Sequence, residues 1–383
     1  MVPRAHSTPQ STLADNRRLI LAALHNSGEL TRAEISQKTG LSSAAVGRIT
    51  TQLEDERFIR RTTQVPSGGG RPAWRYCFTA QGRLLIGARV QADGCHGVLT
   101  SWDGAILERS EVPVSPARAD QGIAENYWSA TAEVVRTLTQ AARDQDARVH
   151  AVGVAVPSVV DHEGTVGMGV EVPWEGFPLA TRLRAVVDGW VVVENDANAL
   201  AVSEADPSAD SLTPETIAAL LLGHGLGAGV LSHGRLLRGS HRTAGEVGFL
   251  LTSARGLGAP LADDGGDLER HIRAASGRPR QDAPGRLWAL LDAEDAHSRQ
   301  HVATMLDYVA LAAASLFTVL DPDFVVLGDI PPGAGERVVA ELTARLTGPL
   351  PHRPRFVLPR SGRDAVMLGA ARLAGAGVDL QAL

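Results

Sequence analysis

The stretch TRAEISQKTGLSSAAVGRITTQLED, from Thr31 to Asp55, carries the signals of two consecutive helices. Thr31 and Glu34 have the spacing of a capping box, which predicts that a helix begins at this point. Thr39-Gly40 predicts its end, because glycine readily takes the left-handed conformation that closes a helix. Ser42 follows and can cap a second helix. The stretch therefore predicts a helix-turn-helix.

The second helix is predicted to have two different faces. Its apolar residues recur at helical spacing, at Val46, Ile49 and Leu53. Its opposite face carries small and basic residues, namely Ser43, Ala44, Gly47 and Arg48. A surface of this kind suits a DNA groove, and we expect Ser42, Ser43 and Arg48 to contact DNA.

A further helix is predicted before this pair, over Ala14 to Ser27. It would close a three-helix core with four apolar residues, Leu19, Ile20, Ala23 and Leu24. We expect Arg17 and Arg18 to stay free on its surface for phosphate contacts.

A β-hairpin is predicted after the helix pair. Aromatic residues at 74, 76 and 78 alternate with other types, which is the two-residue period of a strand. The stretch Ser67-Gly68-Gly69-Gly70-Arg71-Pro72 predicts the sharp tip of the hairpin. This hairpin forms a wing beside the helix pair, and we expect its Arg71 and Arg75 to contact DNA.

The charge of the chain is divided unevenly. Residues 1 to 80 contain 11 Lys and Arg against 6 Asp and Glu, a net charge of +5. The whole chain carries −6, so residues 81 to 383 carry −11. Basic charge is thus concentrated where the helix-turn-helix and the wing are predicted, which favours contact with DNA phosphates over a merely solvated basic face.

The rest of the chain has the composition of a globular α/β protein. A helix is predicted over Ile123 to Asp144, between strands at 85–90, 98–100 and 149–156. We identified no apolar run long enough to span a bilayer and no leader, and the two cysteines are too few for a disulfide framework. We therefore expect a cytoplasmic protein that makes no membrane contact.

Four short stretches occur in a fixed order in this body. They are GVAVPS from Gly153, ENDANA from Glu194, GHGLGAG from Gly223 and GEVG from Gly245. Each is weak alone, but in this order, with Trp174 and Pro178-Leu179 between the first two, they resemble the ROK family of sugar kinases and winged-helix transcriptional repressors. The resemblance extends from the helix-turn-helix to Leu368-Gly369-Ala370.

The resemblance implies the fold class and the domains. It implies an α/β chain with an N-terminal winged helix-turn-helix and a two-lobed, actin-like body of the sugar-kinase (ribonuclease H-like) ATPase fold. We expect the winged helix over residues 1–80, the first lobe over 81–200 and the second over 201–383, with a C-terminal helix that can return to the first lobe.

Asn195 and Asp196 are the first candidates for a sugar site. They follow a predicted strand over residues 190–193, and ligands of α/β folds bind beyond the carboxyl ends of strands. In kinases of the family the residue that matches Asp196 is the general base, and a carboxylate there can accept a hydrogen bond from a sugar hydroxyl. The alternative is that this pair simply caps the next helix.

Glu246 and Glu269 complete the predicted set of carboxylates. Glu246 matches a family residue that contacts sugar hydroxyls, and Glu269 resembles another. An exposed acid at the start of a helix is the alternative for Glu246. We also include His241 as a sugar-facing or surface residue.

The segment that binds phosphate in the family's kinases is altered in this chain. Those kinases carry Asp-x-Gly-Gly-Thr after the first strand of the body, and this chain has Arg89, Gln91, Ala92 and Asp93 at the matching positions. We expect the missing carboxylate to weaken Mg²⁺ binding and Asp93 to repel a phosphate. The glycine run 223–229 remains, with His224 in place of the usual Thr, and tight packing explains it as well as a nucleotide does. The sequence therefore predicts no phosphoryl transfer and no enzyme.

The zinc motif of the family is also altered. Most members continue Gly-Glu-x-Gly-His and add a cysteine cluster, but this chain has Phe249 in place of the His and no cysteine beyond Cys95. One carboxylate, that of Asp267, cannot replace three thiolates, so we expect neither zinc nor any other cofactor. Phe249 either stacks on the apolar side of a sugar or fills the core in place of the metal.

These features predict a sugar-responsive transcriptional regulator. The leading hypothesis is a homodimeric or homotetrameric repressor of carbohydrate-metabolism genes, which binds operator DNA and holds a sugar effector in an inactive kinase-like cleft. One alternative is a sugar kinase with an added DNA-binding domain. Another is a DNA-binding regulator whose sugar site is vestigial.

Overall fold

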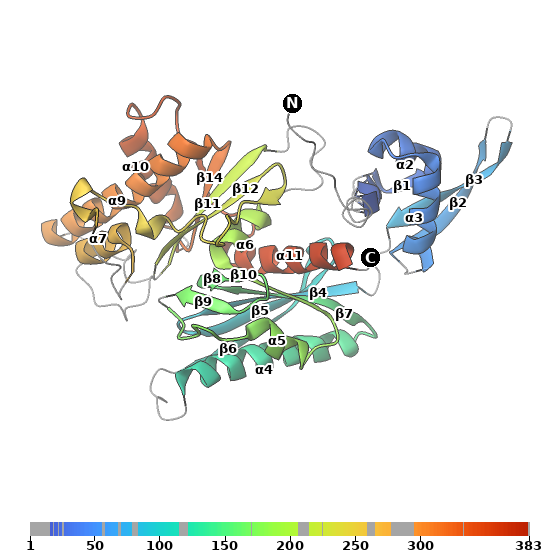
Figure 1. Cartoon of the computed structure of the whole chain (residues 1–383), viewed down its shortest axis with the longest axis horizontal. Coiled ribbons are helices and arrows are strands. Elements are labelled where there is room, and N and C mark those ends of the chain that lie inside the picture. The colour runs from blue at the N-terminus through green and yellow to red at the C-terminus, as the bar shows by residue number, and fades with distance from the viewer. Residues whose placement is uncertain are drawn as a thin grey trace.

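The computed structural model describes residues 16–17, 19–21, 23–24, 27–55, 58–67, 70–78, 83–114, 122–169, 171–205, 214–223, 225–258, 265–276, 295–331 and 333–381. Within these residues the chain forms an N-terminal head and a body with two β-sheets (Figure 1). Each sheet of the body has five strands, and we call the part around the first sheet lobe I and the part around the second lobe II.

The head is the predicted winged helix-turn-helix. Its elements are β1 (Glu29–Thr31), α2 (Arg32–Thr39), α3 (Ser43–Asp55), β2 (Ile59–Ser67) and β3 (Gly70–Phe78), and the sheet order is β1-β3-β2. The capping box is confirmed, since Thr31 accepts from the Glu34 amide and Glu34 accepts from the Thr31 amide. Strands β2 and β3 extend as a long hairpin away from the helices (Figure 1).

The core of the head contains most of the predicted apolar residues. Ile20, Leu24, Ile35, Val46, Ile49, Leu53, Phe58 and Tyr76 are all buried in one cluster. Two predictions for the preceding helix are wrong. Leu19 is 46% exposed, and Arg17 is 1% exposed with its guanidinium 5.7 Å from the ring of Phe58. Arg17 therefore packs in the head and is not free for phosphates, whereas Arg18 lies outside the described residues.

Lobe I is a sheet in the order β10-β7-β4-β5-β6. Its strands are β4 (Arg83–Gln91), β5 (Gly94–Ser101), β6 (Ile106–Pro113), β7 (Arg148–Val156) and β10 (Trp190–Asn195). The amphipathic helix α4 (Ile123–Arg143) covers one face with apolar residues such as Val134 and Leu138. The short hairpin β8 (Ser158–Val160) and β9 (Val166–Gly169) and the helix α5 (Leu179–Arg184) lie between β7 and β10 in the sequence.

Lobe II is a sheet in the order β13-β12-β11-β14-β15. Its strands are β11 (Thr216–Leu222), β12 (Leu226–Ser232), β13 (Arg235–Leu236), β14 (Phe324–Gly328) and β15 (Phe356–Val357). The helices α7 (Asp267–Ser276), α9 (Ala296–Leu320) and α10 (Gly335–Leu346) gather on one side of the sheet (Figure 1). The short 3-10 helices η2 (Val247–Phe249) and η3 (Ala254–Gly256) precede α7.

Helix α9 corrects our statement about apolar runs. Among the described residues it is the one helix that is long and apolar enough to cross a membrane by length and composition. Its apolar residues pack into the core of lobe II, where Val302, Met305, Leu306 and Val309 are buried against β11 and β14 residues. Polar residues such as Asp307 interrupt the apolar residues of this helix, so the sequence shows no unbroken apolar stretch here.

Two helices connect the lobes. Helix α6 (Asp196–Ser203) follows β10 directly and packs against β11 and β12. The C-terminal helix α11 (Ala365–Gln381), preceded by η5 (Gly362–Asp364), packs on β4, β7 and α6. Gly87 and Gly153 allow this approach, because a Cβ at either position would lie 1.9 Å from a carbonyl oxygen of α11.

The head meets lobe I around one aromatic ring. Phe58 of the head lies edge-on to Trp102, with 6.2 Å between ring centroids. The guanidinium of Arg83, at the start of β4, lies 3.5 Å from the centre of the Phe58 ring. Stacking of this kind holds the first residue of the body against the core of the head.

Candidate functional site

A cavity of about 190 Å³ lies between the two lobes. Its walls come from the ends of β4, β7, β8–β9 and β10 in lobe I and from the β11–β12 turn, η2 and the start of α7 in lobe II. Five of the six predicted sugar-site residues line it: Asn195, Asp196, Glu246, Phe249 and Glu269. Residues spread from position 195 to position 269 of the sequence therefore meet at one small cavity.

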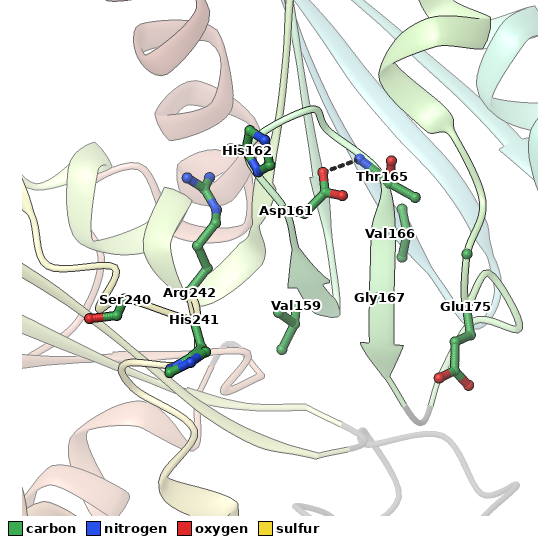
Figure 2. A pocket seen from close by; sticks show the side chains of 11 residues that line it. Val159, Asp161, His162, Thr165, Val166, Gly167, Glu175, Ser240, His241 and Arg242 are labelled. Carbon is green, nitrogen blue, oxygen red and sulfur yellow. Dashed lines mark hydrogen bonds between the residues drawn. The ribbon is translucent and has the colours of Figure 1, made fainter.

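His241 is not part of this group. It lies on the loop after β13 and lines a neighbouring hollow of about 520 Å³, together with Ser240 and Arg242. Figure 2 shows the loop with Ser240, His241 and Arg242 beside the β8–β9 hairpin, in which Asp161 accepts a hydrogen bond from the Thr165 amide. The prediction that His241 belongs with the sugar carboxylates is corrected, because His241 lines this hollow and not the cavity that the carboxylates line.

Asn195 caps the next helix, which is the alternative that the sequence left open, and its contact with a sugar stays a prediction. It is the N-cap of α6, and its Oδ1 accepts from the amides of Ala197 and Asn198 at 2.9 and 3.2 Å. Its Nδ2 donates to the carbonyl oxygen of Ser158 at 3.3 Å. The residue thus caps the helix and, at the same time, forms part of the cavity wall.

Arg89 is the central charge of the cleft. Its Nη1 donates to Oδ1 of Asp329 at 2.6 Å, and its Nη2 donates to Oδ2 of Asp329 at 2.6 Å and to Oδ2 of Asp196 at 3.0 Å. The side chains of Arg89 and Asp196 are 7% and 8% exposed. Because β4 belongs to lobe I and Asp329 follows β14 of lobe II, this buried ion pair joins the two lobes.

The charges of this group shift its pKa values. Burial alone would lower the pKa of Arg89, but Asp329 and then Asp196 raise it above its usual value. Burial raises the pKa of Asp196 to about 6, against the opposing effect of Arg89. Burial, followed by the neighbouring Asp196 and Glu269, raises the pKa of Glu246 to about 7. Glu246 is therefore partly protonated near neutral pH and can donate or accept a hydrogen bond.

Several residues of the cleft were missed by sequence reasoning. Asp329 pairs with a residue 240 positions away, and its left-handed φ of 60° after Gly328 gave no pattern to search for. The buried Oγ of Ser158 lines the cavity and has no hydrogen-bond partner among the described residues. Glu171 also lines the cavity, where its Oε1 accepts from the Ala92 amide at 2.7 Å.

The altered phosphate segment is arranged differently from our expectation. Asp93 does not line the cavity; its carboxylate is 73% exposed and lies 3.3 Å from Nε2 of His96. Arg89 and Asp329, rather than Asp93, occupy the space beside the glycine run, since a Cβ on Gly223 would lie 3.1 Å from Oδ2 of Asp329. Gly229 packs tightly on α6, with 2.2 Å between its added Cβ and the oxygen of Ala197. His224 lies outside the described residues.

The segment that carries zinc in related proteins is held here by side-chain hydrogen bonds. Oδ2 of Asp267 accepts from the amide and the hydroxyl of Thr252, at 2.8 and 2.7 Å. Phe249 is half-buried and lines the sugar-site cavity. Across the described residues no group of three or more His, Cys, Asp or Glu is arranged to hold a metal ion. The donor set at this place does not fit zinc.

The predicted DNA-contacting residues fall into two groups. Ser43 and Arg48 are exposed on α3, and exposed Ser42 caps this helix by accepting from the Ala45 amide at 3.3 Å. Arg75 instead donates to the Glu29 carbonyl at 2.7 Å and to the Glu34 carboxylate at 3.1 Å. We correct its assignment, because these bonds attach the wing to α2. The side chain of Arg71 lies outside the described residues.

Comparison with known proteins agrees with this architecture. Residues 86–376 match the ROK family, and residues 14–65 match the MarR family. An N-acetyl-D-glucosamine kinase of Escherichia coli O9:H4 (strain HS) is 32% identical over 251 residues, which cover 58% of this chain and 79% of the kinase.

Two solved structures share the fold. A ROK family transcriptional regulator, a homologue of the E. coli MLC protein, has a TM-score of 0.73 and 19% identity and covers 97% of this chain and 98% of its own. A ROK family glucokinase from Streptomyces griseus, in complex with glucose and AMPPNP, has a TM-score of 0.61 and 23% identity and covers 76% of this chain and 99% of its own. The chain therefore belongs to the ROK family and carries a MarR-like winged helix in front of its two-lobed body.

Proposed function

We propose that this protein is a sugar-responsive transcriptional regulator that binds operator DNA in the cytoplasm as a homodimer or homotetramer. In its simplest form it represses genes of carbohydrate metabolism and responds to a sugar held between the lobes. The observation that carries the proposal is the combination of an exposed α3 surface on the head with a cleft that keeps its carboxylates but is crossed by Arg89 and Asp329.

The head supports the DNA part of the proposal. Ser43 and Arg48 are exposed on α3, whose buried face packs into the core of the head. A helix held in this way can enter a major groove, while the basic wing lies along the phosphates. The net charge of +5 over residues 1 to 80 adds long-range attraction to DNA.

The cleft supports the sugar part. Its cavity of about 190 Å³ is sized for a single small molecule and contains polar groups from both lobes. Ser158 of lobe I offers a buried hydroxyl, and Glu246 of lobe II offers a carboxyl group. Phe249 provides an apolar surface in the same wall. A ligand with several hydroxyls can satisfy these groups together and so draw the lobes into one arrangement.

The same cleft argues against phosphoryl transfer. Kinase chemistry needs a metal ion and a phosphate chain positioned beside the sugar. In this chain the carboxylate of Asp329, which Arg89 holds, lies against Gly223 at the start of the glycine run. A phosphate at that place would meet the carboxylate of Asp329, so we infer that the protein is not an enzyme and uses no cofactor, zinc included.

A sugar kinase is the second candidate function. It is favoured by the 32% identity to an N-acetyl-D-glucosamine kinase and by Asp196, whose raised pKa of about 6 suits a general base. The engagement of Asp196 with Arg89 opposes it. Incubation with ATP, Mg²⁺ and a sugar panel decides between them, and turnover at ordinary kinase rates of 1 to about 100 per second would reject our proposal.

The central experiment joins DNA and sugar binding. Operator sequences are selected from random duplexes with the full chain, and the affinity of the selected duplex is then measured with and without each sugar of a panel. We expect one sugar or a small group of related sugars to change the affinity. Calorimetry with the same panel measures sugar binding directly. A protein that binds the selected DNA but none of the sugars has a vestigial sugar site.

A further inference from the structure

A second cavity, of about 360 Å³, borders the sugar-site cavity through Arg89, which is the one residue that lines both. Its walls come from β4, β5, β6 and the start of α11. None of the carboxylates proposed to bind sugar lines it. This second cavity is therefore distinct from the proposed sugar site, and a ligand can bind there whether or not a sugar binds between the lobes.

Basic groups outnumber acidic groups around this cavity. Arg89, His96, Arg109 and Arg363 line it, against Glu111 and Asp364. Nη2 of Arg109 lies 2.8 Å from Oδ2 of Asp364, and Nδ1 of His96 lies 3.4 Å from Oε2 of Glu111. The hydrogen bond that His96 donates to the carboxylate of Asp93 raises the pKa of His96, against the effect of burial. The surroundings therefore favour an anion.

Arg363 is a cation for which the described part of the chain provides no counter-charge. Its side chain is exposed at the rim, in η5, and it makes no ion pair or hydrogen bond within the described part of the chain. Oδ2 of the adjacent Asp364 is engaged by Arg109, and its buried Oδ1 has no hydrogen-bond partner among the described residues. Arg363 can therefore turn its guanidinium to a ligand without breaking an existing contact.

A buried donor of Arg89 also lacks a partner. Two of its nitrogens hold Asp329 and Asp196, but its Nε has no hydrogen-bond partner among the described residues, although the residue is only 6% exposed. A buried N–H without an acceptor is costly. Because Arg89 lines this cavity, an anion bound there can supply the missing acceptor.

The position of α11 adds to the attraction. This helix begins at Ala365, directly after the lining residues Arg363 and Asp364. The amino end of a helix carries partial positive charge and favours a phosphate nearby. Arginine forks match the oxygens of phosphate in particular.

We propose that this second cavity binds the phosphate group of a small phosphorylated metabolite, with Arg363 and the Nε of Arg89 as its donors. The cavity of about 360 Å³ leaves room for an organic portion beside the phosphate. Free inorganic phosphate offers the same chemistry, and the experiment separates these two sources.

Isothermal titration calorimetry of the full chain at low ionic strength tests the site, with glycerol 3-phosphate and inorganic phosphate as probes. We expect glycerol 3-phosphate to bind more tightly than inorganic phosphate, and Arg363→Ala to weaken its binding about tenfold. Arg184 in α5 is the matched control, because it is also an exposed arginine for which the described chain provides no partner. Arg184→Ala should leave the affinity unchanged.

The outcomes have clear meanings. Tighter binding of inorganic phosphate, lost in Arg363→Ala, keeps the site but overturns the metabolite as its ligand. Absence of binding, equal loss in both variants, or binding that Arg363→Ala does not affect would overturn the site. Sugar binding by Arg363→Ala is measured in the same preparation, so a failure of the sugar proposal is recognised separately. An unchanged melting temperature confirms that this surface variant is folded.

Discussion

The head and the cleft use arginine in opposite ways. Arg48 is exposed on α3, and its charge faces solvent. Arg89 is buried between the lobes, and its charge faces Asp329 and Asp196 of its own chain. An exposed cation keeps its attraction for a polyanion such as DNA, whereas a buried cation must be matched within the protein and so becomes a structural connection.

The largest effect is expected from Arg89→Ala, which removes the buried cation of the cleft. Removal of the guanidinium leaves two carboxylates in the cleft without their cation, and we expect the body to lose about 3 to 5 kcal/mol of stability. Urea denaturation followed by tryptophan fluorescence measures this loss. Arg61→Ala is the control, because the exposed Arg61–Glu54 pair of the head should contribute at most about 1 kcal/mol. Equal losses in the free energy of unfolding for the two variants would show that the buried ion pair stabilises the protein no more than the exposed pair does.

The next effect concerns the pH dependence of stability. Burial, with Asp196 and Glu269 nearby, raises the pKa of Glu246 from 4.5 to about 7. The folded protein then binds more protons than the unfolded chain between these pH values, so the free energy of unfolding falls as the pH rises through that range. Each unit of pKa difference corresponds to about 1.4 kcal/mol.

Glu246→Gln tests this expectation, since glutamine has the same shape but does not titrate. Melting temperatures of the two proteins are compared from pH 4.5 to pH 7. We expect the variant to lose less stability over this interval. Parallel curves would mean that Glu246 titrates normally.

Arg48→Ala tests whether the exposed arginine of the head contacts DNA. If Arg48 contacts DNA, its loss should weaken operator binding by about 1 to 3 kcal/mol, and loss of a phosphate contact should also reduce the salt dependence. Fluorescence anisotropy at several salt concentrations measures both quantities. Arg184→Ala is the control, because Arg184 is an exposed arginine in α5 of the body, outside the head. An unchanged affinity for Arg48→Ala would remove α3 from the proposed interface.

The smallest change in stability is expected at Thr252 and Asp267, a hydrogen-bonded pair that is less buried than Arg89 and less exposed than Arg48. Thr252→Val removes the hydroxyl that donates to Asp267 at 2.7 Å but keeps the backbone bond, so we expect a loss of about 1 kcal/mol. Chelators should leave the melting temperature unchanged, and elemental analysis should find no tightly held zinc. One zinc per chain would contradict the view that hydrogen bonds alone hold this segment.

Local patterns predicted the head and much of the body. The capping box at Thr31 and Glu34 acts between residues three apart, so the sequence displays both partners. The same holds for the apolar face of α3 and for the strand period of the wing. Arg17 is the exception, because its burial depends on the ring of Phe58, which follows the helix-turn-helix.

The cleft was predicted in part. The family resemblance identified Asn195, Asp196, Glu246, Glu269 and Phe249, and the structure brings these five together. It gave no warning that Asp329 would pair with Arg89 or that His241 would line a different hollow. Such pairings depend on how the two lobes approach each other, and no periodicity of the sequence records that approach.

The sequence by itself determined which residue types were present: a basic winged helix, retained carboxylates in the body, and an arginine where the family's kinases carry an aspartate. Helix caps, strand periods and net charge act over short distances or over whole segments, so the chain order reveals them. Only the tertiary structure decided that Arg89 joins the lobes through Asp329 and that Arg89 also lines a second cavity. Ion pairs form between residues close in space, and a separation of 240 positions hides them from any local pattern.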